Sequence, residues 1–301
     1  MEYSVGYDIG GTYIRIAIVS EYGNIVKTIK EETGKIKNGE DLRDRIVALY
    51  EKINAKEYNP IGLGIGICGP VYQKTGYVYI LPNIGIGNFN LKKLVQEKID
   101  IPVFVGNDAN MAGLAEAKLG SGINHKIVQY ITVSTGIGGA LIINGKVIEG
   151  RDGFAQEIGH MIISSSKRKQ SQATNFGSWE SQCSGTAIYN RAIEEGLNVS
   201  NTRDVFELEK KENPIAKKII SDWIKDMGVA IANINLYIEP NIYIIGGGVS
   251  NSAKFYFDEI KEEIDKYIFE GCKGKITLVQ AKLGPDSGII GAALQAFYIS
   301  H

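Results

Sequence analysis

Hydrophobic positions cluster in three short runs at the start of the chain, over residues 3–9, 13–19 and 25–29. Turn residues separate them: Gly10-Gly11 follow the first run, and Tyr22-Gly23-Asn24 follow the second. Short apolar runs bounded by turn signals predict an antiparallel meander of three strands. Helical spacing of apolar residues then predicts a helix over 40–56. The pattern continues with a strand at 61–68, a helix at 91–99, a strand at 101–105 and a helix at 109–119.

The same order of elements starts again at residue 127. Strands are predicted at 127–134, 140–143 and 146–148, and the pair Asn144-Gly145 between the last two is a strong hairpin signal. A helix at 214–237, a strand at 242–245, a helix at 252–268, a strand at 276–281 and a helix at 286–298 follow. Two such halves predict an α/β fold with two mixed sheets. Glycines end several strands and place loops at one sheet edge, where ligands bind in open α/β folds. Two halves facing each other would flank a deep cleft.

Composition narrows the classes of function. The length of 301 residues suits two domains. The formal net charge of -1 gives no electrostatic reason to expect nucleic acid or an anionic membrane as a partner. The three cysteines form no CxxC pair, which favours a reducing compartment. We find neither a signal-peptide pattern nor an apolar run of about 18 residues, so we expect a soluble, cytoplasmic protein.

Two glycine-rich hairpin tips stand at corresponding places in the two halves. In the first, glycines let backbone N–H groups approach a phosphate, while Asp8 could hold Mg²⁺ through water. The second tip, residues 134–139, lacks the lysine of a P-loop and precedes no helix, which excludes a Walker A motif and a dinucleotide fingerprint. Each tip alone could be an ordinary tight hairpin. Together they predict a phosphate clamp that includes Asp8, Gly10, Gly11, Thr12, Thr135 and Gly136.

Three further motifs carry candidate chemistry. Gly246-Gly247-Gly248 end a strand before a helix, so they form either a flexible turn or a close approach for adenine and ribose. Asn107-Asp108 open a helix, where Asp is a common N-cap, but a carboxylate beside a phosphate site is also a natural general base. If residues 157–160 are helical, Glu157 and His160 share one face; a lone histidine such as His160 can also be structural or merely exposed. No second histidine completes a HExxH-like metal site, so we expect this pair to bind sugar hydroxyls.

Taken together, these motifs resemble those of the ROK family of sugar kinases, within the superfamily of hexokinase, actin and the heat-shock chaperone ATPases. The resemblance runs nearly end to end and rests on five motifs in the family's order: 8–12, 106–109, 135–139, 157–160 and 246–248. It implies a ribonuclease-H-like core in both domains. The smaller N-terminal domain would comprise residues 1–108 plus 287–301, and the larger domain residues 109–286, with the final helix packing back on the first domain.

The resemblance also implies roles for single residues. Asp108 would be the catalytic base. The sugar would be bound by Asn107, Asp108, Glu157, His160, Glu180, Gly69 and Asn83; Glu180 enters through Gly177-Ser178-Trp179-Glu180, which resembles the family's Gly-Cys-x-Glu. Mg-ATP would be bound by Asp8, Gly10, Gly11, Thr12, Thr135, Gly136, Gly247 and Gly248.

One departure from the family is informative. Many members bind structural zinc through the histidine that corresponds to His160 and three cysteines. Aligned on Gly177 and Glu180, those cysteine positions hold Ser171, Ala173 and Ser178 here. None supplies a thiolate, and a zinc site needs about four N, S or O ligands. We therefore predict that the chain binds no zinc.

The implied reaction transfers the γ-phosphoryl group of ATP to the 6-hydroxyl of a hexose such as glucose, with mannose, glucosamine or N-acetylglucosamine as further acceptors. A kinase specific for an N-acetylated amino sugar is the nearest alternative. A sugar-responsive repressor would need a helix-turn-helix before the phosphate loop, and we expect none. A non-kinase ATPase would have no reason to carry Asn107-Asp108 with the Glu and His residues above. The expected partners are a hexose and ATP, and family members are often homodimers.

Overall fold

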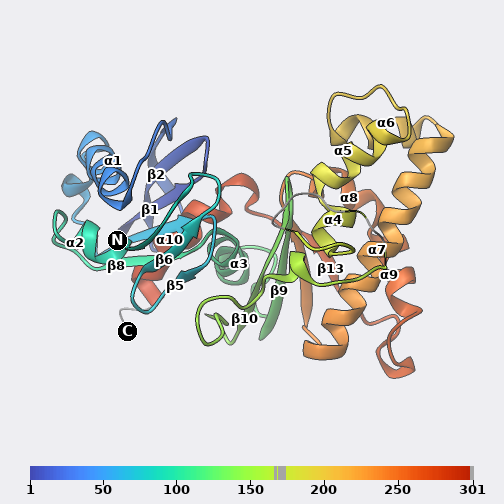
Figure 1. Cartoon of the computed structure of the whole chain (residues 1–301). Coiled ribbons are helices and arrows are strands. Elements are labelled where there is room, and N and C mark those ends of the chain that lie inside the picture. The colour runs from blue at the N-terminus through green and yellow to red at the C-terminus, as the bar shows by residue number, and fades with distance from the viewer. Residues whose placement is uncertain (166–167, 169–173, 299–301) are drawn as a thin grey trace. The chain divides into compact units, whose positions relative to one another are not determined.

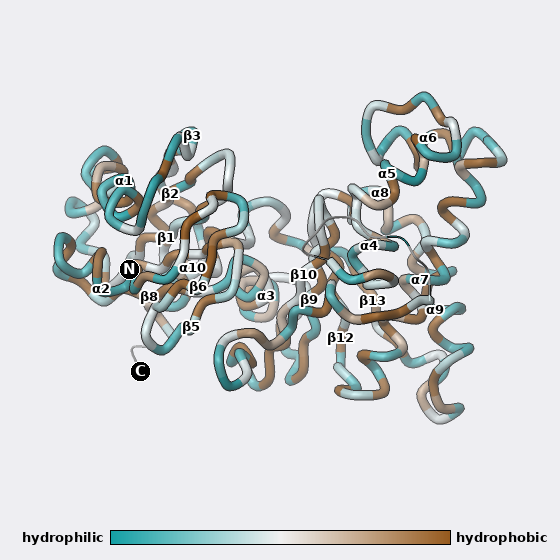
Figure 2. The backbone as a smooth tube through the Cα atoms, in the orientation of Figure 1, coloured by the Kyte–Doolittle hydropathy of each residue, from teal (hydrophilic) through white to brown (hydrophobic). Residues whose placement is uncertain are grey.

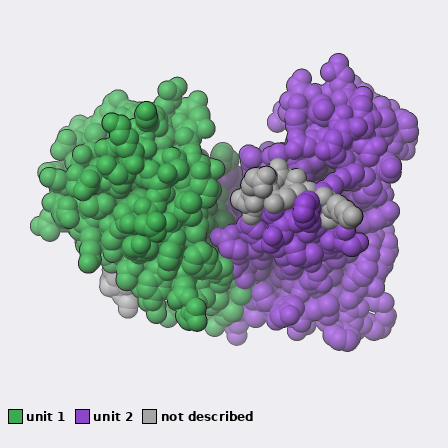
Figure 3. Space-filling view, in the orientation of Figure 1, with its two compact units in different colours: residues 1–124, 140–155, 285–301 green, residues 125–139, 156–284 purple. Residues whose placement is uncertain are grey.

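The computed structural model describes residues 1–165, 168 and 174–298 of the chain. These residues form two compact units, coloured separately in Figure 3. Unit 1 comprises residues 1–124, 140–155 and 285–301, and unit 2 comprises residues 125–139 and 156–284. The domains predicted from the sequence follow its internal repeat rather than these contacts, and their boundaries stay a prediction.

A five-stranded mixed sheet organises unit 1 (Figure 1). Its strands lie in the order β3-β2-β1-β4-β8, with β1 (Tyr3–Ile9), β2 (Tyr13–Ser20), β3 (Ile25–Glu32), β4 (Leu63–Ile67) and β8 (Val103–Asn107). The first three strands form the predicted antiparallel meander. The central strand β1 then pairs in parallel with β4, and β4 pairs in parallel with β8. The three parallel strands consequently end at the same edge of the sheet.

Glycines in two strands let the last helix lie directly on this sheet. Helix α10 (Ser287–Tyr298) contacts β1, β4 and helix α3 (Asp108–Leu119). A Cβ at Gly6 of β1 would lie 2.3 Å from the carbonyl oxygen of Ile289, and one at Gly64 of β4 would lie 1.8 Å from that of Ala292. Neither contact is possible for a larger residue. The close approach fixes the start of α10 beside the end of β1.

Unit 1 also contains a small antiparallel sheet that the sequence pattern did not predict. It has the order β5-β6-β7, with β5 (Val71–Tyr72), β6 (Tyr77–Leu81) and β7 (Ile86–Asn90). The remaining helical elements are α1 (Gly39–Lys52), η1 (Ala55–Tyr58) and α2 (Leu91–Gln96). In Figure 2 the tube along α1 alternates between teal and brown, as expected for a helix with one buried and one exposed side.

A second five-stranded sheet has the order β11-β10-β9-β12-β13. Its strands are β9 (Ile127–Val133), β10 (Ile137–Ile143), β11 (Lys146–Val147), β12 (Ile242–Gly246) and β13 (Leu278–Gln280). Strand β12 pairs in parallel with both β9 and β13. The two mixed sheets confirm the predicted α/β fold class.

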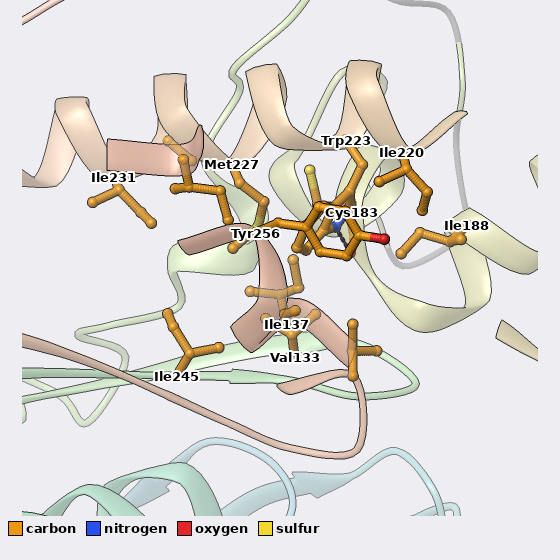
Figure 4. Packing of buried hydrophobic residues seen from close by; sticks show 14 of the residues in the cluster. Val133, Ile137, Cys183, Ile188, Ile220, Trp223, Met227, Ile231, Ile245 and Tyr256 are labelled. Atoms are coloured by element: carbon orange, nitrogen blue, oxygen red, sulfur yellow. Dashed lines mark hydrogen bonds between the residues drawn. The ribbon is translucent and has the colours of Figure 1, made fainter. Parts of the chain in front are cut away.

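Helices of unit 2 enclose an apolar core. They are η2 (Ile158–His160), α4 (Trp179–Cys183), α5 (Gly185–Glu194), α6 (Thr202–Lys210), α7 (Pro214–Ile238), α8 (Ser250–Ala253), η3 (Lys254–Tyr256), α9 (Phe257–Asp265) and η4 (Glu270–Cys272); the 3₁₀ turn η5 (Gly284–Asp286) leads into α10. In Figure 4 Trp223 of the long helix α7 lies among buried hydrophobic side chains that include Ile220 and Tyr256, and its indole N–H donates to the carbonyl of Cys183 at 3.1 Å. The buried indole therefore satisfies its one donor. Among the residues described, no helix combines the length and apolar composition needed to cross a bilayer.

Candidate active site

Strand register gathers three of the predicted site segments at one edge of the unit 1 sheet. In the parallel pairing, Ile9 lies opposite Ile67, and Ile67 lies opposite Asn107. Asp8 directly precedes Ile9, Asp108 directly follows Asn107, and Gly69 lies two residues after Ile67. Segments that are about 60 and 100 residues apart along the chain therefore meet because parallel strands end together.

The structure distinguishes the roles of Asn107 and Asp108. Asn107 is the N-cap of α3, and its side-chain oxygen accepts from the N–H groups of Ala109 at 2.9 Å and Asn110 at 3.2 Å. Its amide nitrogen donates to the carbonyl of Gly69 at 3.3 Å. Asp108 is half-buried in the first helical turn. The Asp108 carboxylate accepts from the same Ala109 N–H at 2.8 Å. Both side chains therefore contribute to the start of α3, although Asn107 alone occupies the N-cap position.

The first glycine tip packs closely against a second predicted sugar residue. A Cβ at Gly11 would lie 2.8 Å from both the Cβ and the carbonyl oxygen of Asn83, so only glycine fits there. The Asn83 amide also donates to the Cys68 sulfur at 3.3 Å. Gly69 follows with a φ of +133°, which glycine tolerates far better than other residues. The structure thus brings Asn83 against both the glycine tip at Gly11 and the 68–69 turn, while Thr12 at that tip is exposed.

Asp8 lies in a charged environment at the end of β1. The Arg15 guanidinium is 4.0 Å from the Asp8 carboxylate and pairs more closely with Asp286, which directly precedes α10. Burial raises the pKa of Asp8 above its usual range, Arg15 lowers it, and Asp286 raises it again. A carboxylate withdrawn from water is stabilised by a neighbouring cation. Carboxylate oxygens are the donors that Mg²⁺ prefers, so the chemistry of Asp8 fits the predicted metal.

The second glycine tip and three predicted sugar residues meet within unit 2. The Glu180 carboxylate accepts from the backbone N–H of Ile137 at 2.8 Å. A Cβ at Gly159 would lie 2.2 Å from the Ile137 carbonyl oxygen, so the turn between Glu157 and His160 rests on the same residue. This segment forms a single 3₁₀ turn, η2, in which the N–H of His160 donates to the Glu157 carbonyl at 3.0 Å.

These three polar residues also interact electrostatically. Partial removal from water raises the pKa of Glu157, His160 lowers it, and the Glu180 carboxylate raises it. Although neighbouring protein groups shield part of Glu157 from water, both Glu157 and His160 keep a large exposed surface, whereas Glu180 is half-buried. Two carboxylates and an imidazole in one place offer acceptors and donors to a polyhydroxylated ligand.

The third glycine segment, residues 246–248, packs against the end of β9. Gly247 has a φ of +79°, and a Cβ there would lie 2.3 Å from the carbonyl oxygen of Val133. Gly248 faces open space, since a Cβ there would meet only the Ser134 hydroxyl, at 4.0 Å. Beside it lies a cavity of about 500 Å³ within unit 2. Its lining includes Thr135 and Gly248 of the predicted set together with Thr186, Tyr189, Arg203 and Phe206.

The residues of α5 and α6 that line this cavity were not among the site residues predicted from the sequence. These helices lie in the region that the pattern left unassigned, yet Asn201 and Asp204 would have marked the start of α6. Asn201 caps that helix by accepting from the N–H of Asp204 at 3.2 Å. An Asn before an apolar periodic run is a helix start signal.

The positions that correspond to the family's zinc ligands are only partly described. Ser171 and Ala173 lie outside the described residues. Ser178 is buried, caps α4 and donates its hydroxyl to that of Ser181 at 2.7 Å. Within the described part of the chain, no three His, Cys, Asp or Glu side chains gather as a metal would require.

Comparison with known proteins places these sites in a family. A glucokinase of Halalkalibacterium halodurans is 31% identical over 95% of this chain and 92% of its own length. The xylose repressor of Bacillus subtilis is 27% identical over 99% of this chain and 77% of its own length. Two crystal structures are also similar. That of a ROK hexokinase from Thermus thermophilus has a TM-score of 0.87 at 28% identity and covers 99% of both chains.

The second, a ROK family glucokinase from Streptomyces griseus in complex with glucose and AMPPNP, has a TM-score of 0.78 at 28% identity and covers 97% of this chain and 98% of its own. The model of the ROK family itself matches residues 4–297, which include every predicted site residue. With the family's motifs arranged on two matching sheets, the chain belongs to the ROK family.

Proposed function

We propose that this protein is an ATP-dependent hexose kinase that phosphorylates the 6-hydroxyl of glucose or a related sugar. The observation that carries the proposal is the arrangement at the end of β8, where Asn107 caps α3 and the Asp108 carboxylate stands in its first turn. A carboxylate at that edge, beside the glycine tip that follows Asp8, suits a general base for phosphoryl transfer. The similarity to a glucokinase and to a glucose and AMPPNP complex supports the choice of substrates.

In the proposed reaction the oxygen of the sugar 6-hydroxyl bonds to the γ-phosphorus of ATP, and Asp108 accepts the proton of that hydroxyl. The bond between the γ-phosphorus and the bridging oxygen breaks at the same time, and ADP leaves. The protein's contribution is mainly positioning and stabilisation of charge. Asp8 would hold Mg²⁺, which neutralises charge on the phosphates. The glycine tips would present N–H groups to the phosphates.

We assign the cavity of unit 2 to the nucleoside part of ATP. Gly247 and Gly248 would let the ligand approach the backbone, and Thr135 and Gly136 would contact its phosphates. Tyr189 and Phe206 offer apolar and aromatic surface, while Arg203 and the hydroxyls of Thr186 and Thr202 offer polar contacts. A volume of about 500 Å³ falls in the usual range for small-molecule sites.

The sugar would be bound by polar side chains from both parts of the predicted site. Glu157, His160 and Glu180 supply a donor and acceptor set, and Asn83 and Gly69 lie beside the Asp8 loop. A kinase for an N-acetylated amino sugar is the nearest alternative, since the same groups would bind its hydroxyls. A sugar-responsive repressor is the alternative of another class, because xylose repressors are among the relatives. Cytoplasmic location and a homodimer stay predictions.

The test is the variant Asp108→Ala, with Asp100→Ala as the matched control because Asp100 is exposed in the connection between α2 and β8. We expect Asp108→Ala to lower kcat at least about 100-fold, since a general base contributes typically about 10²–10⁴-fold. ATP binding should survive, and the control should turn over normally. Near-normal kcat in Asp108→Ala would remove Asp108 from the role of base.

A further inference from the structure

One residue next to the sugar candidates has an unusual backbone. Gln156 has a φ of +68°, in the left-handed region that costs a non-glycine residue about 1 kcal/mol or more. Of the other non-glycine residues described with positive φ, five are Asn, which tolerates this conformation. The remaining two, Glu212 and Glu239, stand at the ends of helices, where left-handed residues are common. Neither explanation applies to Gln156, because it lies in the loop that leads into Glu157.

A buried amide holds Gln156 in place. The side-chain oxygen of Gln156 accepts from the amide nitrogen of Gln129 at 2.8 Å. Gln129 is fully buried in the central part of β9, and the same nitrogen also donates to the carbonyl of Tyr130 at 3.1 Å. Burying an amide is unfavourable unless it forms hydrogen bonds, so this bond ties the loop to the sheet. Gly139 on the neighbouring strand leaves room for the turn that follows Glu157, since a Cβ there would lie 2.4 Å from the side chain of Ile158.

The hydrogen bond between Gln129 and Gln156 restrains the position of the next residue, Glu157. Glu157 begins the η2 turn, and the turn is fixed at its other end because Gly159 rests on the Ile137 carbonyl. Glu157 and His160 are thus held from both sides: by the Gln129–Gln156 bond before the turn and by the packing of Gly159 within it. A backbone in an unfavourable conformation persists only where its surroundings determine it, and such positions cluster at functional sites.

We infer that Gln129 and Gln156 form a positioning pair, which sets the orientation of Glu157 and His160 for binding the sugar acceptor. This inference rests on the proposed kinase function. The pair contacts no reacting atom and acts through Glu157. Its effect should therefore appear in the affinity for the sugar and not in the affinity for ATP.

The experiment measures KM for glucose and for ATP, together with the thermal midpoint, in three single variants and one double variant. Gln156→Gly and Gln156→Ala both remove the amide, Gln129→Met removes its partner at similar volume, and Gln129→Met with Gln156→Gly removes both. We expect each single variant to raise the KM for glucose about threefold to tenfold, as for one neutral hydrogen bond, with the KM for ATP unchanged. The double variant should resemble the single ones, because the pair acts as a unit.

Backbone strain supplies a second readout. Gln156→Ala keeps the unfavourable φ and Gln156→Gly relieves it, so the alanine variant should melt at the lower temperature. Equal changes in both KM values, or glucose KM values that stay at the wild-type level in folded Gln156→Gly, would overturn the inference. Independent, additive effects in the double variant would also overturn it. Failure of the kinase proposal is distinguishable, because the wild-type protein would then release no ADP in response to any sugar.

Discussion

A methyl group added at Gly136 should displace Glu180 without harming the fold. Gly136 has no left-handed backbone, so space alone limits the substitution. The Cβ of Gly136→Ala would lie 2.4 Å from the Oε2 atom of Glu180, about 1 Å inside ordinary van der Waals contact. That atom is the end of a flexible side chain and can move away. It would then give up its hydrogen bond of 2.8 Å from the Ile137 N–H.

The magnitude follows from the kind of bond that Glu180 would make with a sugar hydroxyl. Hydrogen bonds to charged groups contribute about 1.5–3 kcal/mol, which corresponds to about 10- to 100-fold in affinity. We therefore expect Gly136→Ala to raise the KM for the sugar by that factor. The KM for ATP should change little, since the new methyl points at Glu180 and leaves the Gly136 N–H in place. Unfolding free energy should fall by no more than about 1 kcal/mol.

Steady-state kinetics with each substrate varied in turn, together with urea unfolding, would measure these effects. Gly271→Ala is the matched control, because no atom lies within 4 Å of a Cβ at Gly271 and its backbone is unstrained. A folded Gly136→Ala variant with the wild-type KM for sugar would refute the role of Glu180. A large rise in the KM for ATP alone would show that Gly136 serves only the phosphates.

Three further predictions concern stability and the nucleotide. Burial raises the pKa of Asp226 from 3.8 to about 6 in the folded protein. As pH rises, the Asp226 carboxyl therefore loses its proton in the unfolded chain before it does so in the folded protein. The free energy of unfolding of the wild type consequently falls between about pH 4 and about pH 6. Asp226→Asn should be more stable than the wild type by about 1–3 kcal/mol above pH 7 and by little at pH 4. If urea unfolding shows the same difference in stability between the two proteins at both pH values, this prediction is wrong. Gly64→Ala should lower the unfolding free energy by about 1–3 kcal/mol or more, because its Cβ would meet the Ala292 carbonyl at 1.8 Å, and an unchanged urea midpoint would be inconsistent with the packing of α10. Gly247→Ala, which is strained and would contact the Val133 carbonyl, should weaken ATP binding in calorimetry, and unaltered affinity would remove this turn from the nucleotide site.

The sequence predicted the two main sheets because their signal is local. Apolar runs that end in glycines, as at Gly10 and Gly247, mark both the strands and the loops that follow them. Parallel pairing then brings such loops to one edge, which is why Asp8 and Asn107 could be placed in one site before their register was known.

The parts that the sequence did not predict depend on contacts between distant segments. The strands β5, β6 and β7 are only two to five residues long and pair with one another rather than with the main sheet. Helices α5 and α6 do carry apolar residues at helical spacing, a signal that the sequence prediction did not use. From the sequence, Asp108 was a possible N-cap of α3, whereas the structure gives that position to Asn107; both residue types are good N-caps. The left-handed backbone of Gln156 leaves no trace in composition, because it results from a hydrogen bond to a residue 27 positions away.

The most direct test of the central claim is ADP release from Mg-ATP with glucose, mannose, glucosamine, N-acetylglucosamine, fructose or no sugar. We predict release that depends on the sugar, with glucose or a close relative of glucose as the preferred acceptor and with loss of the activity in Asp108→Ala. Release that is the same with and without sugar, or no release with any member of the panel, would contradict the assignment as a hexose kinase.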